Sequence, residues 1–237
     1  MGNCAEMLAT HRGYTRQKQD EYAIESYARA IKSIKEEIFK SEIIPVSIKT
    51  KSREIEIFDN DQEPRNLDYH KVPKLKPVFE PAGTITAANS SKLSDGASVS
   101  LISSLSKAEQ LGIKPVARII AHASVSHEPE WFTTAPMKAI NKVLQKACLN
   151  LSDIDLWEIN EAFSVVPMAA MEELNIDRDI INIYGGSVAL GHPIGATGAR
   201  ILTTLINGLS RERLRLGLAA ICIGGGEASA MIIQRND

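Results

Sequence analysis

The sequence predicts an α/β layered fold with a mixed sheet, and three observations lead to this expectation. Helical and β-rich segments alternate from about residue 115 to the end of the chain. Glycine-rich stretches follow several of the predicted strands. The last two β-rich runs, LGLAAICIG and ASAMIIQR, are separated by a short turn that runs from Gly224 to Glu227. Such a hairpin adds an antiparallel pair to strands that are otherwise joined through helices, so the sheet is expected to be mixed.

The first predicted element is an amphipathic helix over residues 15–38. Its apolar positions recur at steps of three and four, with Lys, Glu and Arg on the other face. The side chain of Thr15 suits the cap at its start. The apolar stripe consists of Ala23, Tyr27, Ala30, Ile34 and Ile38.

The stretch that follows is extended and irregular. EIIPVSIKT, residues 42–50, reads as a short strand, and Pro45 favours an edge position. Residues 50–85 are charged and contain four prolines, which excludes a long helix and predicts an excursion over the surface. A polar loop, ITAANSSKLSDGASVSLIS, then leads into a short helix through KAEQLG.

The remaining segments give the alternation. PVARIIAHASVS, DIDLWEIN and IINIYGG are expected as strands. APMKAINKVLQKACL, EAFSVVPMAAMEELN and TGARILTTLINGLSRERL are expected as helices. Pro136 and Pro167 fall in the first turns of the first two helices, where a missing N–H costs little.

Composition narrows the classes of function. The formal net charge is −2, so no sequence-wide basic field points to nucleic acid or an anionic membrane. No apolar run reaches the length of a membrane span. The three cysteines, Cys4, Cys148 and Cys222, are widely spaced, which argues against a disulfide framework or a zinc cage. We expect reduced thiols, an intracellular protein and no metal site.

Three side chains that could take part in catalysis stand at the ends of predicted strands: Asn160, His192 and Cys222. Each alone has an ordinary structural interpretation, as a helix cap, a hydrogen-bonded histidine or a core cysteine. Together they suit carbanion chemistry at a thioester carbonyl. A thiol can move a proton, a histidine can activate a nucleophile, and glycine amides beside the cysteine can line an oxyanion hole.

These residues resemble the thiolases, in particular acetyl-CoA acetyltransferases. NEAF, GGSVALGHPIGATGAR and CIGGG are similar to three C-terminal signature blocks of that family, in its order and spacing. AANSSKLSDGAS resembles a CoA-contacting loop, and MGNCAE resembles a block that contributes a pocket methionine. The resemblance implies a thiolase-like layered fold with a βαβαβαββ half, together with part of an inserted loop domain.

The resemblance also implies roles for individual residues. His192 would activate a nucleophilic cysteine and help to form a first oxyanion hole, whose water Asn160 would hold. Cys222 would be the acid and base at the α-carbon of acetyl-CoA. The amide of Gly224 would serve a second oxyanion hole. The substrate-binding residues implied are Met1, Ser91, Leu93, Ala162 and Phe163. Arg65, Lys71 and Lys74 are candidates for the nucleotide of CoA, although solvated surface charge is the better explanation for all three.

The implied organisation is a partial loop domain over residues 1–94, a remnant of the N-terminal half over 95–114 and the C-terminal domain over 115–237. The nucleophilic cysteine of the family would lie before Met1, and neither Cys4 nor Cys148 stands in a matching block. We therefore expect a C-terminal portion that is inactive alone and exposes an apolar face where the first half would pack.

The activity implied is condensation of two acetyl-CoA to acetoacetyl-CoA and CoA, and its reversal by thiolysis. The alternatives are a 3-ketoacyl-CoA thiolase of broader chain length, or a non-catalytic CoA- or acyl-binding fragment that needs a partner half. No metal or redox cofactor is expected, while a monovalent cation remains open. Expected partners are acetyl-CoA, acetoacetyl-CoA and CoA, with a dimeric or tetrameric full protein. Expected locations are the cytoplasm or the mitochondrial matrix, with any import signal preceding Met1.

Overall fold

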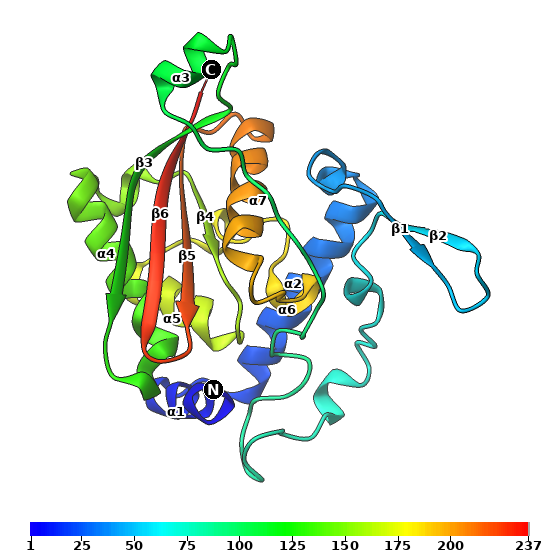
Figure 1. The fold of residues 1–237 in the computed structure, drawn as a ribbon. Coiled ribbons are helices and arrows are strands. Elements are labelled where there is room, and N and C mark those ends of the chain that lie inside the picture. The colour runs from blue at the N-terminus through cyan, green and yellow to red at the C-terminus, as the bar shows by residue number, and fades with distance from the viewer. Residues whose placement is uncertain (237) are drawn as a thin grey trace.

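A computed structural model describes residues 1–236, and a four-stranded mixed sheet forms its centre (Figure 1). The strand order is β3 (Ala117–Ser126), β6 (Glu227–Arg235), β5 (Leu216–Ile223) and β4 (Leu156–Ile159). β5 and β6 form the expected hairpin, β3 pairs antiparallel with β6, and β4 pairs parallel with β5. The prediction of a mixed α/β sheet is therefore confirmed.

Helices pack on both faces of this sheet, although not over the whole of either face, because apolar side chains alternate along its strands. On β5, Leu218 and Ala220 point into the main core with α4 (Ala135–Ala147) and α5 (Val165–Leu174). Ala219 points to the other side, where it packs with Leu205 of α7 (Thr197–Arg211). Pro136 and Pro167 lie in the first turns of α4 and α5, as expected.

The N-terminal part lies beside the sheet. α2 (Arg16–Lys35) confirms the first predicted helix, and Thr15 accepts a hydrogen bond from the backbone N–H of Lys18. The helix stops before Ile38, which belongs to a short 3-10 turn, η1 (Ile38–Ser41). β1 (Val46–Lys49) and β2 (Ile55–Phe58) form a separate two-stranded ribbon that projects from the body in Figure 1.

Residues 50–85 contain no long helix, as their four prolines predicted, and the irregular stretch continues to residue 116. It holds two 3-10 turns, η2 (Glu63–Arg65) and η3 (Val72–Lys74), and the short helix α3 (Leu105–Gln110). Four exposed apolar side chains gather before and at the start of α3: Val99, Leu101, Ile102 and Leu105. Within the described residues, no helix is both long and apolar enough to cross a membrane.

Two expectations about the elements need correction. The first helix of the chain, α1 (Gly2–Arg12), was missed because its small buried residues form no strong amphipathic stripe. The strand expected over residues 180–186 is absent, apart from one bridge between Trp157 and Ile181. Asn182 explains this second error. Its backbone has φ 46°, and its side-chain amide hydrogen-bonds both the N–H and the carbonyl of Ile159. The side chain thus takes the place of the backbone hydrogen bonds that a further strand would make with β4.

Four further short segments complete the description. η4 (Pro129–Thr134) precedes α4, and η5 (Leu151–Asp153) precedes β4. η6 (Arg178–Ile180) and the single-turn helix α6 (Ser187–Leu190) occupy the long connection between α5 and α7. This connection matters for the site, because α6 leads directly into His192.

Candidate active site

The parallel pair β4 and β5 brings two of the expected residues to one edge of the sheet. Asn160 directly follows β4, and its backbone N–H donates to the carbonyl of Ala220 at 2.9 Å. Cys222 stands two residues further along β5. Because parallel strands end at the same edge, the sequence prediction that these two strand ends share a site agrees with their placement.

His192 is anchored on three sides. Its backbone N–H donates to the carbonyl of Lys92 at 2.8 Å, and its Nδ1 lies 2.6 Å from Oγ1 of Thr197. Its Nε2 lies 3.4 Å from Nδ2 of Asn160, a long contact of the kind that tightens when substrate binds. Burial, with a smaller effect of the nearby Arg200 guanidinium, lowers the pKa of His192 from its usual value. The ring is therefore neutral at pH 7 and has a free lone pair.

Cys222 is a free, buried thiol with no hydrogen bond to Asn160 or His192 in the described part of the chain. Burial raises its pKa to about 12, so the resting group is a thiol and a proton donor. The turn that follows it is built by Gly225 and Gly226, whose φ angles of 116° and 86° favour glycine. The resting protonation state thus suits delivery of a proton to a carbanion.

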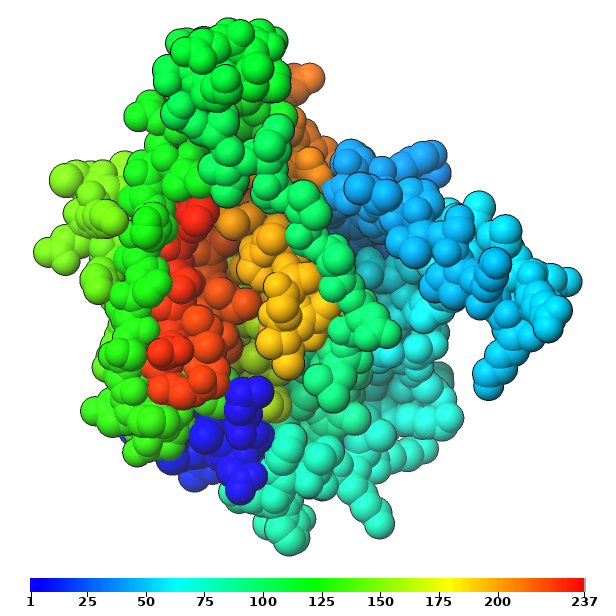
Figure 2. Space-filling view, in the orientation of Figure 1, coloured from blue at the N-terminus to red at the C-terminus, as the bar shows by residue number. Residues whose placement is uncertain are grey.

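Met1 lies directly over this turn. Its Sδ would stand 2.9 Å from a β-carbon at Gly224, which shows how closely the two residues approach. In Figure 2, the N-terminal residues, the β5–β6 turn and the segment around residue 192 lie on one face of the molecule. Met1, Gly224 and the histidine segment thus border the same surface.

The loop before residue 95 joins the remaining predicted residues to His192. The backbone N–H of Ser91 donates to the carbonyl of Ala162 at 3.0 Å. Isolated bridges pair Ser90 with Phe163 and Leu93 with His192. Ser91, Leu93, Ala162 and Phe163 therefore lie along one backbone seam beside the histidine, and Leu93 is exposed on its outer side.

Sequence reasoning missed Glu161, although the NEAF block contains it. Its carboxylate is fully buried and accepts four hydrogen bonds, two at each oxygen. The donors are Tyr22 and Ser26 of α2, Asn182, and the backbone of Val188 in α6. Glu161 therefore fastens α2 and the helix before His192 to the end of β4. The signal in the sequence was a charged residue directly after an apolar strand.

Lys92 was also not singled out. Its Nζ lies 2.9 Å from the carbonyl of Ser90 and 3.3 Å from that of Val188, and it stands 5.5 Å from the centre of the Tyr27 ring. Burial lowers the pKa of this lysine to about 8. The ammonium group thus joins the loop that holds Ser91 to the helix that precedes His192.

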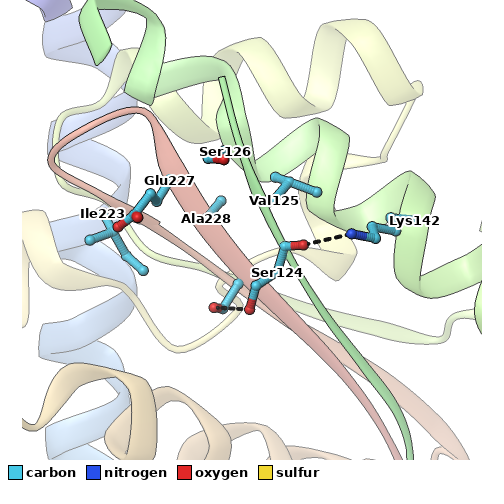
Figure 3. A pocket seen from close by; sticks show the side chains of 8 residues that line it. Ser124, Val125, Ser126, Lys142, Ile223, Glu227 and Ala228 are labelled. Carbon is cyan, nitrogen blue, oxygen red and sulfur yellow. Dashed lines mark hydrogen bonds between the residues drawn. The ribbon is translucent and has the colours of Figure 1, made fainter. Parts of the chain in front are cut away.

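A hollow of the described surface lies elsewhere, on the sheet itself (Figure 3). It measures about 610 Å³ and is lined by residues of β3 and β6, the end of β5, and Lys142 of α4, whose Nζ donates to the carbonyl of Ser124. Asn160, His192 and Cys222 do not line it.

The arrangement can therefore accept a proton at His192, deliver one from Cys222, and stabilise a developing oxyanion with an asparagine amide and turn amides. Residues 1–236 contain no group of three His, Cys, Asp or Glu side chains placed to hold a metal ion.

The chain is similar to known proteins over nearly its whole length. The family model "Thiolase, C-terminal domain" matches residues 113–235, and "Thiolase, N-terminal domain" matches residues 1–106. An acetyl-CoA acetyltransferase of Yarrowia lipolytica is 48% identical over 99% of this chain and 58% of its own length. A mitochondrial acetyl-CoA acetyltransferase of Bos taurus is 46% identical over 99% of this chain and 56% of its own.

Solved structures are similar over the whole chain. The Bacillus anthracis acetyl-CoA acetyltransferase superposes with a TM-score of 0.94 at 39% identity, over 100% of this chain and 60% of that one. The Acat5 thiolase of Ascaris suum, crystallised with coenzyme A, gives 0.89 at 41% identity, over 99% and 60%. Human mitochondrial 3-ketoacyl-CoA thiolase gives 0.91 at 34% identity, over 98% and 59%. The chain thus spans rather more than half the length of these relatives.

Proposed function

Because this chain belongs to the thiolase family, we propose that it is the C-terminal portion of an acetyl-CoA C-acetyltransferase. The complete protein condenses two acetyl-CoA to acetoacetyl-CoA and CoA, and cleaves acetoacetyl-CoA in the reverse direction. One observation carries this proposal above the others. The side chains of Asn160 and His192 meet at 3.4 Å, at the sheet edge where β5 delivers Cys222.

In the proposed mechanism, neutral His192 accepts the proton of the nucleophilic cysteine through its Nε2. Asn160 then stabilises the oxyanion that forms on the thioester carbonyl. In thiolysis, Cys222 donates its proton to the α-carbon of the leaving acetyl-CoA enolate and becomes a thiolate. In condensation, Cys222 first gives its proton to the CoA thiolate that leaves during acyl transfer. The resulting Cys222 thiolate then removes an α-proton from the second acetyl-CoA, while the amide of Gly224 stabilises the enolate oxygen.

The nucleophile itself belongs to the part of the relatives' length that this chain does not span. We propose that this part packs on the outer face of β3 and β6. α7 covers β4 and β5, whereas Ile223 is exposed at the hollow of Figure 3 and Ile119 of β3 is also exposed. On this view, residues 1–94 belong to a loop domain, 95–114 to the first half and 115–237 to the second, and the full protein is a dimer or tetramer.

The chain's own residues supply the charges that this chemistry needs, so we propose that no metal or redox cofactor takes part. The ammonium of Lys92 already occupies the space between the carbonyls of Ser90 and Val188. A monovalent cation would compete for the same two oxygens. Replacing Lys92 by Met should weaken the seam beside His192 and make activity depend on added potassium or ammonium ions. Equal activity of this variant in sodium, potassium and ammonium salts would contradict this.

A 3-ketoacyl-CoA thiolase of broader chain length is the alternative that a specific observation favours, because the human enzyme of that name shares the fold at a TM-score of 0.91. Thiolysis rates for 3-ketoacyl-CoA substrates of increasing length separate the two. A steep fall beyond four carbons supports the acetyltransferase, and a flat profile supports the alternative.

For the compartment, we propose the mitochondrial matrix or the cytoplasm. The similarity to a mitochondrial acetyl-CoA acetyltransferase of Bos taurus supports the former.

Isotope exchange tests the mechanism in the longer protein, or in this chain assembled with its missing half. Cys222→Ala should abolish exchange of the acetyl-CoA α-protons with D2O and leave acyl transfer to the nucleophile measurable. His192→Gln should impair both. Exchange that survives in Cys222→Ala would contradict the role of this thiol. An assembled protein that binds CoA without either reaction would indicate the non-catalytic alternative.

A further inference from the structure

A chain of side-chain hydrogen bonds runs behind Asn160, on the side away from His192. Nη2 of Arg200 donates to Oγ of Ser187 at 2.9 Å, and Oγ of Ser187 lies 2.6 Å from Oδ1 of Asn160. Ser187 and Asn160 are buried, and Arg200 extends from α7 toward the carboxylate of Glu158, 3.8 Å away. Three elements distant in sequence thus meet at one hydroxyl group.

The direction of these bonds follows from the donors available. A guanidinium has only N–H donors, so the Ser187 oxygen must accept from Arg200. The serine has a single O–H, which is then free to donate to Asn160. In the structure this O–H donates to the amide oxygen of Asn160, which leaves the amide NH2 facing His192. Because Arg200 occupies one of the two acceptor sites on the serine oxygen, it favours this orientation of the asparagine.

The opposite side of the imidazole agrees with this direction. The hydroxyl of Thr197 donates to the carbonyl of Pro193 at 2.9 Å, so its oxygen accepts from Nδ1–H of His192. Nε2 then carries no proton and accepts from the Asn160 amide. Both ends of the network assign the same tautomer.

We propose that Ser187 and Arg200 are positioning residues, which hold the Asn160 amide so that its NH2 faces His192 and Nε2 of the histidine stays unprotonated. This inference rests on the proposed function, because an unprotonated Nε2 is the state that accepts a proton from a nucleophile. If the amide turned over, its oxygen would face His192 and favour a proton on Nε2. That form could neither accept the proton nor present the amide N–H to an oxyanion.

The tautomer can be measured on the 237-residue chain without any activity assay. The 15N chemical shifts of the imidazole distinguish Nδ1–H from Nε2–H in 15N-histidine-labelled protein, recorded above the pKa, and His192→Gln assigns the signals. We expect Nδ1–H in the unmodified chain. Ser187→Ala should lower the ratio of Nδ1–H to Nε2–H by about fivefold, the factor that one hydrogen bond supports.

Ser164→Ala is the matched control, because it removes a buried hydroxyl that has no hydrogen-bond partner among residues 1–236. It should leave the tautomer ratio unchanged. Arg200→Lys keeps the positive charge near Glu158 with a shorter side chain and should change the ratio as Ser187→Ala does. Should Ser187→Ala fail to fold, this variant decides by the same criterion. An Nε2–H form in the unmodified chain, or an unchanged ratio in the folded variants, overturns the proposal.

Steady-state kinetics of the longer protein separates this inference from the proposed function. Ser187→Ala should lower kcat about fivefold and leave KM nearly constant, because the amide acts on the reacting groups and not on the bulk of the substrate. If the substitutions change the tautomer ratio as expected but even the unmodified protein has no thiolase activity, the proposed function fails and the positioning role of Ser187 and Arg200 stands. If the unmodified protein is active and the substitutions leave the tautomer ratio unchanged, only the positioning role fails.

Discussion

Replacing Glu161 by Gln tests the structural centre of the site most directly. The substitution conserves shape and removes the charge of a carboxylate that accepts four hydrogen bonds in the interior. One carboxylate oxygen becomes an NH2 group, which cannot accept. Whichever way the new amide turns, two of the four donors lose their acceptor: Tyr22 and Asn182 on one side, or Ser26 and the Val188 backbone on the other.

The magnitude follows from those two lost bonds. Hydrogen bonds to a charged acceptor contribute about 1.5–3 kcal/mol each. The neutral amide is less costly to bury than the carboxylate, which offsets part of the loss. We therefore expect Glu161→Gln to lower the free energy of unfolding by about 3 kcal/mol. With a slope of about 2.5 kcal/mol per molar urea, the unfolding midpoint should fall by about 1 M.

Urea unfolding of the chain, followed by far-UV circular dichroism, measures this shift. Glu173→Gln is the control, because it neutralises a more exposed carboxylate that pairs with Arg12 on the surface. Such a pair contributes about 0–1 kcal/mol. Equal midpoints for the two variants would refute the conclusion that Glu161 fastens α2 and α6 to the sheet.

Three further predictions concern groups around the site. Burial raises the pKa of Glu158 from 4.5 to about 8, so between these pH values the folded chain binds more protons than the unfolded chain and its stability falls as pH rises. Glu158→Gln should therefore flatten the change in Tm between pH 5 and 8.5. An unaltered dependence of Tm on pH would contradict this prediction. Gly226→Ala should lower the free energy of unfolding by about 2–3 kcal/mol, because φ is 86° and a β-carbon would stand 2.2 Å from the carbonyl oxygen of His127. A β-carbon at Gly195 meets open space, so Gly195→Ala should be neutral in the same urea assay. Iodoacetamide at pH 8 should label exposed Cys148 well before buried Cys222, as peptide mass spectrometry would show, and the reverse order would exclude the buried thiol described for β5.

Local patterns in the sequence were sufficient for most elements of the fold. The stripe of α2, the prolines in the first turns of α4 and α5, and the hairpin of β5 and β6 all follow from signals within a few residues. The placement of Asn160 and Cys222 at strand ends was also predictable, because each directly follows or ends an apolar run. These features depend on residues that are neighbours in sequence, so the amino-acid sequence alone is sufficient to predict them.

The sequence could not show which residues hold the site in shape. Asn182 turned a predicted strand into a turn by bonding the backbone of Ile159, 23 residues away. Glu161 meets Tyr22 across 139 residues, and Ser187 meets Asn160 across 27. Buried polar groups are stable only where a partner satisfies them, and folding alone chooses that partner. The sequence therefore determined which chemical groups this protein has at its strand ends, while the tertiary structure decided how they are oriented and which side chains keep them so.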